Sequence, residues 1–170
     1  MKFSSKWVTA WISLLFASSA LSVASAVNYS DAFFHYTIDF PTGWENLNQK
    51  PPSIAFGGRM EKDFRTNINI ISEPSKEVSL SRYIQSVKVT LGKLKAIKIL
   101  SEKKCTLGGE SAVQLRMHLS LPGKPPIDDR QIICLRNKRA FLITCTALTE
   151  TYKKSDPLFD KTLNTFKWGK

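Results

Sequence analysis

The side chains best suited to acid–base chemistry in this sequence are two histidines and one pair of adjacent acids. His35 and His118 stand in unrelated segments, and neither has a second ligand at a spacing typical of a zinc site. Asp128 and Asp129 adjoin Arg130 just after a proline-rich stretch, which is more typical of solvated charges on a loop than of a catalytic pair. We therefore predict no metal site and no cofactor, and interpret His35 as a surface histidine.

Covalent catalysis would need a serine, threonine or cysteine held beside a base and an orienting group. The chain contains no Gly-x-Ser-x-Gly motif, and Cys105, Cys134 and Cys145 do not stand in a recognisable protease context. The paired glycines Gly57-Gly58 and Gly108-Gly109 lack the surrounding pattern that cradles phosphate. The sequence predicts a protein that is not an enzyme, with a periplasmic enzyme assembled from distant loops as the alternative.

A group of lysines is the most informative charged feature. The chain carries 25 lysines and arginines against 14 acids, a formal net charge of +11. Six of these lysines lie on or just after the polar side of one predicted helix: Lys88, Lys93, Lys95, Lys98, Lys103 and Lys104. Such a group is ordinarily a solvated helix surface, and the functional alternative is a binding surface for anionic lipid, polysaccharide or an acidic envelope protein. Nucleic acid is not expected as a partner, because no stacking aromatic residues are interleaved with these lysines.

The first 26 residues have the three parts of a secretory signal peptide. Two lysines form a short basic head, a mostly apolar stretch follows to about residue 23, and Ala24-Ser25-Ala26 offers a cleavage site. We expect cleavage after Ala26, no membrane-spanning segment after it, and a mature protein that is periplasmic or secreted. The remainder, residues 27–170, has the size of a single domain.

Alternating apolar and polar residues predict a sheet that would hold these groups. Strands are expected over residues 34–40, 53–56, 68–71, 97–107, 110–121, 131–135 and 140–147. Gly57-Gly58 should end the second of these strands, whereas Gly108-Gly109 and Asn137-Lys138 should form tight hairpin turns.

Two helices are expected beside this sheet. Apolar residues recur at intervals of three and four from Leu80 to Leu94, with Ser79 placed to cap the start. A second helix should begin near the C-terminus, with Ser155 as its cap and Pro157 in its first turn. The last two strands are almost continuously apolar, which indicates a sheet covered on both faces. The predicted fold is α+β, a mainly antiparallel sheet in a three-layer α/β/α sandwich.

The hairpin geometry makes a prediction about the cysteines. If Asn137-Lys138 form the turn, Cys134 lies opposite Phe141 and Cys145 opposite Arg130. The two cysteines are then about 13 Å apart along the strand, at about 3.3 Å per residue. A disulfide needs Cα atoms within about 7 Å, so Cys134 and Cys145 should not bond to each other. Any disulfide within the chain must use Cys105, and without one all three should be buried thiols.

Several stretches resemble the PsbP-like family of exported domains. Tyr36-Thr37-Ile38-Asp39-Phe40-Pro41-Thr42-Gly43-Trp44 resembles the opening strand of that family, with its proline turn and following tryptophan. Leu107-Gly108-Gly109-Glu110-Ser111-Ala112 resembles its central glycine hairpin. Residues 139–147, then Tyr152, Phe159 and Leu163-Asn164-Thr165-Phe166-Lys167, resemble its final strand and closing helix.

The resemblance spans roughly residues 34–167. It implies an antiparallel sheet between helices and a domain that binds or assists and does not catalyse. The chain lacks the lipid-bearing cysteine of some relatives, and its histidines match no metal site of the family, so a photosynthetic role is not expected. We hypothesise a non-catalytic exported accessory or binding protein of the bacterial envelope. A secreted factor that acts on a host or a competitor stays open.

Overall fold

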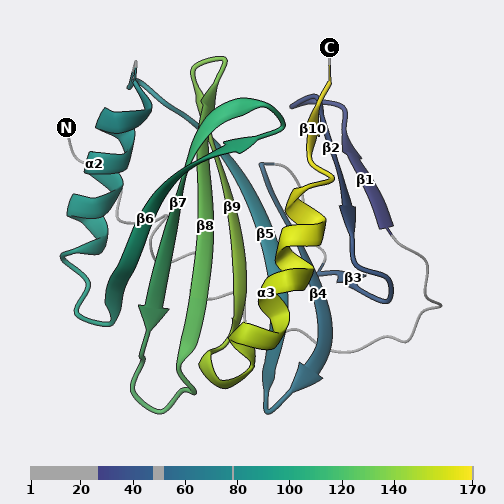
Figure 1. The fold of residues 1–170 in the computed structure, drawn as a ribbon, viewed down its shortest axis with the longest axis vertical. Helices are drawn as coiled ribbons and strands as arrows, with labels where there is room; N and C mark the ends of the chain where they lie inside the picture. The colour runs from purple at the N-terminus through teal and green to yellow at the C-terminus, as the bar shows by residue number, and fades with distance from the viewer. Residues whose placement is uncertain (1–26, 48–51, 78, 170) are drawn as a thin grey trace.

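The structure is a computed structural model in which residues 27–47, 52–77 and 79–169 are described. The signal peptide expected over residues 1–26 therefore lies outside the described residues. The larger of two antiparallel sheets has the strand order β3 (Glu45–Asn46), β4 (Ser53–Glu61), β5 (Phe64–Pro74), β9 (Arg139–Leu148), β8 (Ile127–Arg136), β7 (Glu110–Leu119) and β6 (Ile97–Leu107) (Figure 1).

A smaller sheet and two helices complete the described part of the chain. The strands of the smaller sheet are β1 (Val27–Asp31), β2 (Tyr36–Phe40) and β10 (Lys167–Trp168), with β2 in the middle. Helix α2 (Leu80–Leu91) lies beside the β6 edge of the larger sheet, and α3 (Thr149–Leu163) crosses the face that Figure 1 shows. Within the described residues, no helix is long and apolar enough to cross a membrane.

Neighbouring side chains of the central strands enter different hydrophobic clusters. On β8, Ile132 belongs to a cluster that includes Phe159 of α3, whereas Ile133 belongs to a second cluster that includes Ile84 of α2. The smaller sheet contributes Ile38 and Phe40 to the first cluster. Because side chains alternate along a strand, β8 and β9 bury apolar residues on both sides, as their continuous hydrophobic sequence predicts.

The start of α2 and both hairpin turns are confirmed. The Ser79 side chain accepts a hydrogen bond from the Arg82 amide, which caps the helix. Gly108 and Gly109 have φ of 55° and 88°, and Asn137 and Lys138 have φ of 51° and 58°. Two successive positive φ values are typical of a type I′ turn, whose twist suits a two-residue hairpin.

Several predicted boundaries are wrong. Strand β5 runs over Phe64–Pro74 where residues 68–71 are expected, and β8 over Ile127–Arg136 where residues 131–135 are expected. Strand β4 continues through Gly57-Gly58 to Glu61, with a register shift after Gly57 that accommodates the glycines. Helix α3 begins at Thr149, so Ser155 and Pro157 lie inside it. The Ser155 hydroxyl donates to the Thr151 carbonyl within the helix and does not cap a start.

Candidate functional site

The structure brings together an acid, a histidine and a threonine that the sequence left apart. His118 on β7 lies opposite Asp128 on β8, and its Nδ1 is 2.7 Å from Oδ1 of Asp128. Thr149, the first residue of α3, donates its hydroxyl to the same carboxylate oxygen over 3.1 Å. The prediction that Asp128 and Asp129 are loop residues is therefore wrong, since both lie within β8.

This cluster does not have the geometry of a nucleophilic relay. In such a relay the hydroxyl contacts one ring nitrogen of the histidine and the carboxylate contacts the other. Here the Thr149 hydroxyl and the Asp128 carboxylate both approach Nδ1 of His118, at 3.4 Å and 2.7 Å. The carboxylate therefore orients the ring and holds the start of α3, because it bonds both residues at once.

Asp129, the next residue, is buried on the other face of the sheet. Desolvation by burial raises the pKa of its carboxyl from 3.8 to about 7, and the nearby Asp128 adds to the rise while Thr146 opposes it. Its Oδ1 atom has no hydrogen-bond partner among the described residues. With a pKa near 7, this buried carboxyl is partly protonated at neutral pH.

An arginine network fastens α3 to the sheet. The buried Arg130 guanidinium pairs with Asp160 and lies 2.5 Å from Oδ1 of Asp156. The guanidinium carbon of Arg116 sits 4.0 Å from the ring centre of Tyr152, in a cation–π contact. Burial disfavours charge on Arg130, but its hydrogen bond to Asp160 raises the pKa above its usual range. Each charged group in this network has a partner of opposite charge. We therefore interpret the network as a structural contact between α3 and the sheet.

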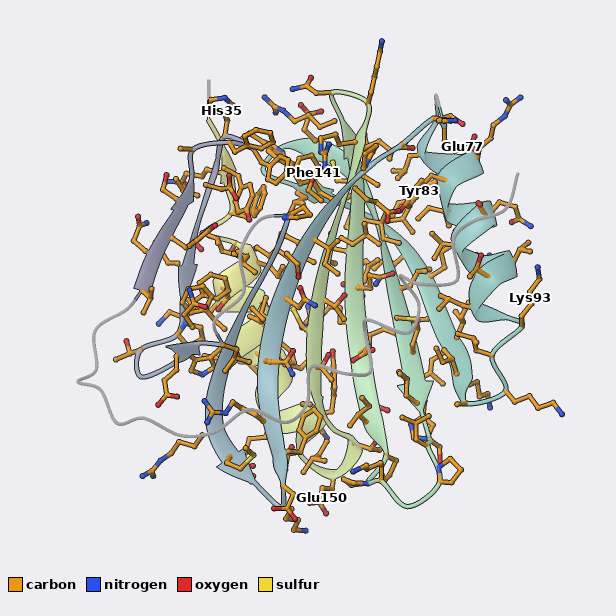
Figure 2. The ribbon with its side chains drawn as sticks, turned by 180° about the vertical axis from the view of Figure 1, so that it is seen from behind. His35, Glu77, Tyr83, Lys93, Phe141 and Glu150 are labelled. Carbon is orange, nitrogen blue, oxygen red and sulfur yellow. The ribbon has the colours of Figure 1, made fainter. Side chains whose placement is uncertain are left out.

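Metal ligands are not gathered in the part of the chain that the structure describes. No group of three or more histidine, cysteine, aspartate or glutamate residues is arranged there to hold an ion. His35 is exposed in the turn between β1 and β2, as expected of a surface histidine. Figure 2 shows it at one end of the molecule, and its carbonyl accepts a hydrogen bond from the Gly169 amide.

The six predicted lysines lie around one edge of the larger sheet, on α2, on β6 and in the turn between them. Lys93 and Lys95 are exposed in that turn, and Figure 2 shows Lys93 at the outer end of α2. Lys88 forms an ion pair with Glu102 of β6, with Nζ 2.7 Å from Oε2. This ion pair joins α2 to β6 at the edge of the sheet, and it leaves Lys88 less available to an anionic partner than the other five lysines.

The register of β6 divides the remaining lysines between two faces. Lys98 lies opposite His118, and Lys103 opposite Gln114, on the side of the sheet that α3 covers. Lys104 lies opposite Val113, whose side chain belongs to the cluster beneath α2. Among the six lysines, Lys93 and Lys95 therefore form one exposed pair in the α2–β6 turn. The lysines of β6 lie on both faces of this edge strand.

Comparison with known proteins places this fold in a defined class of domains. Residues 24–168 match the model of the PsbP family. The chain belongs to the PsbP family. No curated protein gives a significant match.

Solved structures share the fold at low sequence identity. The solution structure of cyanobacterial PsbP from Synechocystis is 16% identical, with a TM-score of 0.62 over 91% of this chain and 98% of that one. LpqN of Mycobacterium tuberculosis, involved in cell envelope biogenesis, is 15% identical, with a TM-score of 0.57 over 88% and 93%. A Pseudomonas aeruginosa protein of unknown function is 15% identical, with a TM-score of 0.59 over 82% and 93%. At this identity the likeness concerns the fold.

Proposed function

We propose that this protein is a non-catalytic exported accessory protein that contacts anionic surfaces of the bacterial envelope through its lysine edge. The observation that carries the proposal is the exposed α2–β6 turn with Lys93 and Lys95, flanked by Lys98 on the adjoining strand. The formal net charge is +11 for the full chain and +9 once Lys2 and Lys6 are removed with the expected signal peptide, and it adds a long-range attraction toward anionic surfaces.

Three further observations support parts of this proposal. The signal-peptide pattern of residues 1–26 supports export, and LpqN, a structural relative, is a protein of cell envelope biogenesis. Membership of the PsbP family supports a role that does not involve catalysis. The separate clusters under α2 and α3 support the three-layer description of the fold.

The edge position also gives the β6 lysines an ordinary structural role. An unpaired edge strand attracts other strands, and lysines along it discourage such pairing. Lys98, Lys103 and Lys104 are exposed on this edge strand. Lys93 and Lys95 lie outside the strand, so edge protection does not explain them, and they are the residues to test.

The test is co-sedimentation of the purified protein with vesicles that contain phosphatidylglycerol, with pure phosphatidylcholine vesicles as the neutral reference. Binding should fall steeply as salt rises past physiological strength, where the screening length is about 8 Å. The double variant Lys93→Glu, Lys95→Glu should bind at least about tenfold more weakly, since one lysine near such a surface contributes about 1 kcal/mol.

The matched control is Lys153→Glu, Lys154→Glu, which makes the same change of charge at two exposed positions on α3. A protein attracted only by its net charge would lose the same affinity in both double variants. Equal losses would therefore overturn the proposed surface, whereas a larger loss at Lys93 and Lys95 supports it.

A further inference from the structure

Six polar side chains form a compact array on the face of the larger sheet opposite α3, the face toward the viewer in Figure 2. They come from three adjacent strands, β5, β9 and β8, and the register aligns them in two rows. The first row is Asn67, Thr146 and Asp129, and the second is Asn69, Thr144 and Gln131. With strands about 4.8 Å apart and about 6.8 Å between alternate residues, the array covers about 10 by 7 Å.

Apolar residues frame the array on three sides. Ile71, Leu142 and Ile133 form the next row at one end. At the other end Leu148 pairs with Ile127, and β5 contributes the buried Arg65 to that row. Along β7, Met117 and Leu115 lie opposite Asp129 and Gln131. The array is therefore a polar island in a buried apolar surface, a composition typical of ligand sites.

The fourth side is lined by residues with little or no side chain. Gly57 and Ala55 of β4 lie opposite Asn67 and Asn69. A Cβ atom at Gly57 would come within 2.6 Å of Cδ of Arg65, whose side chain passes over this glycine to pair with Glu45. Arg65 and Leu47 therefore fill the space beside Gly57, and only Ala55, opposite Asn69, leaves the β5 edge of the array with a small neighbour.

The hydrogen-bonding capacity of the island is not used up within the described residues. Asn69, Thr144, Thr146, Asp129 and Gln131 are all buried, and Nε2 of Gln131 donates to the Thr144 hydroxyl over 3.1 Å. Oδ1 of Asn69 and Oδ1 of Asp129 have no partner there. Unsatisfied buried polar atoms cost stability, so an apolar set of the same size would hold the sheet together better. We therefore expect a ligand that donates hydrogen bonds to these unpartnered oxygens.

The chemistry of the island selects the class of ligand. Carboxamides and hydroxyls each donate and accept hydrogen bonds, and the single carboxyl joins them as a donor when it is protonated. A ligand with several groups that both donate and accept, spaced over one or two rings, matches this pattern. An anion would lack donors for the free oxygens of Asn69 and Asp129. We propose that this polar array binds a neutral saccharide, mainly through its row of Asn69, Thr144 and Gln131.

This site uses none of the lysines of the α2–β6 edge, so its test is independent of the vesicle experiment. Cellotriose, maltotriose and triacetylchitotriose are each titrated into the purified protein and followed by amide chemical shifts. At least one should bind with a Kd in the range of about 1 mM or tighter, and the shifts should centre on β5, β8 and β9.

Two variants test the named side chains. Asn69→Leu and Thr144→Val should each weaken binding about tenfold or more, since each removes hydrogen-bonding groups from the site. Asn164→Leu, which changes the same residue type at the exposed end of α3, should leave binding unchanged. Asn69→Leu should not lower the melting temperature, because it removes an unpartnered atom, whereas a structural network would lose stability.

The proposal is overturned if none of the three sugars shifts resonances of β5, β8 and β9 at about 10 mM, well above the expected Kd. That result would mean that the array encloses only water. It is equally overturned if a sugar binds elsewhere on the protein, or if Thr144→Val binds as tightly as the parent protein. Thr144→Val keeps the side-chain shape and so remains informative if Asn69→Leu fails to fold.

Discussion

Cys145 lies directly opposite Arg130 in the β8–β9 ladder, which keeps its thiol away from Cys134, whose own partner is Phe141. All three cysteines are free, and Cys134 and Cys145 are buried. Burial raises the pKa of the Cys134 thiol to about 11 and that of Cys145 further still. Because the thiolate is the reactive form, neither side chain is prepared to react in the folded protein.

We therefore expect an order of thiol labelling. Cys105 is only half buried, so the prediction that all three are buried thiols is wrong for this residue. Partial burial still raises its pKa, against the lowering effect of Lys103. A maleimide reagent at neutral pH should modify Cys105 first, and Cys134 and Cys145 only as the protein unfolds. Peptide mass spectrometry with and without urea measures this order. Labelling of Cys145 at the rate of Cys105 in the native protein would contradict it.

The Arg130 network predicts unequal effects on stability. Arg130→Met leaves Asp160 without its cation and Asp156 with only Arg116, 3.6 Å away. Both carboxylates are partly exposed, so the cost should be about 2 kcal/mol, below the range for fully buried pairs. Asp160→Asn should cost less than about 1 kcal/mol, because Arg130 keeps Asp156 and solvent screens the exposed Asp160 carboxylate.

Urea unfolding curves measure both changes, with Lys161→Met at an exposed position of the same helix as the control. Equal losses for Arg130→Met and Asp160→Asn would show that the single Asp160 contact, and not the shared network, holds α3 in place.

The register of the last hairpin could be predicted from sequence because local chemistry determines it. Asn137 tolerates positive φ, and a two-residue turn fixes which residues face each other on both strands. The start of α3 could not be found in this way. Ser155 followed by Pro157 has the sequence of a helix start, whereas the actual N-cap, Leu148, makes no side-chain hydrogen bond that a sequence would reveal.

The polar island shows a second limit of the sequence pattern. Asn67 and Asn69 alternate with buried isoleucines, a pattern usually interpreted as a polar, solvent-facing side of a strand. Alternation identifies the face on which a side chain lies, but not whether that face is buried. The array exists only because β5, distant in sequence, pairs with β9 of the β8–β9 hairpin, and this pairing depends on the strand order of the sheet.

The glycine hairpin gives a stability prediction with an internal control. Gly108 has φ of 55°, and a Cβ there would lie 2.8 Å from Cδ1 of Trp168. Gly123 has φ of 70° with nothing within 4 Å of that position. Gly123→Ala should cost about 1 kcal/mol for the left-handed backbone. Gly108→Ala adds a steric conflict of about 1–3 kcal/mol.

Thermal unfolding compares the two variants, and near-ultraviolet circular dichroism reports Trp168, whose Nε1 donates to the Leu107 carbonyl over 2.9 Å. Only Gly108→Ala should alter the tryptophan signal, because its new methyl group displaces the ring. An unchanged signal together with matching losses of stability would exclude this contact.

Asp129 predicts how stability depends on pH. Its folded-state pKa of about 7 lies above the ordinary 3.8, so between these values the folded protein holds a proton that the unfolded chain releases. Stability should fall as pH rises from about 4 to 7, by at most about 4 kcal/mol at 1.36 kcal/mol per pKa unit.

Asp129→Asn cannot titrate and should remove this slope, so the variant gains stability relative to the parent at pH 8. The control Glu61→Gln, at an exposed position, should keep the slope. Urea unfolding at successive pH values measures it, and a parent protein as stable at pH 7 as at pH 4.5, with Asp129→Asn following the same curve, would show that the buried carboxyl ionises freely.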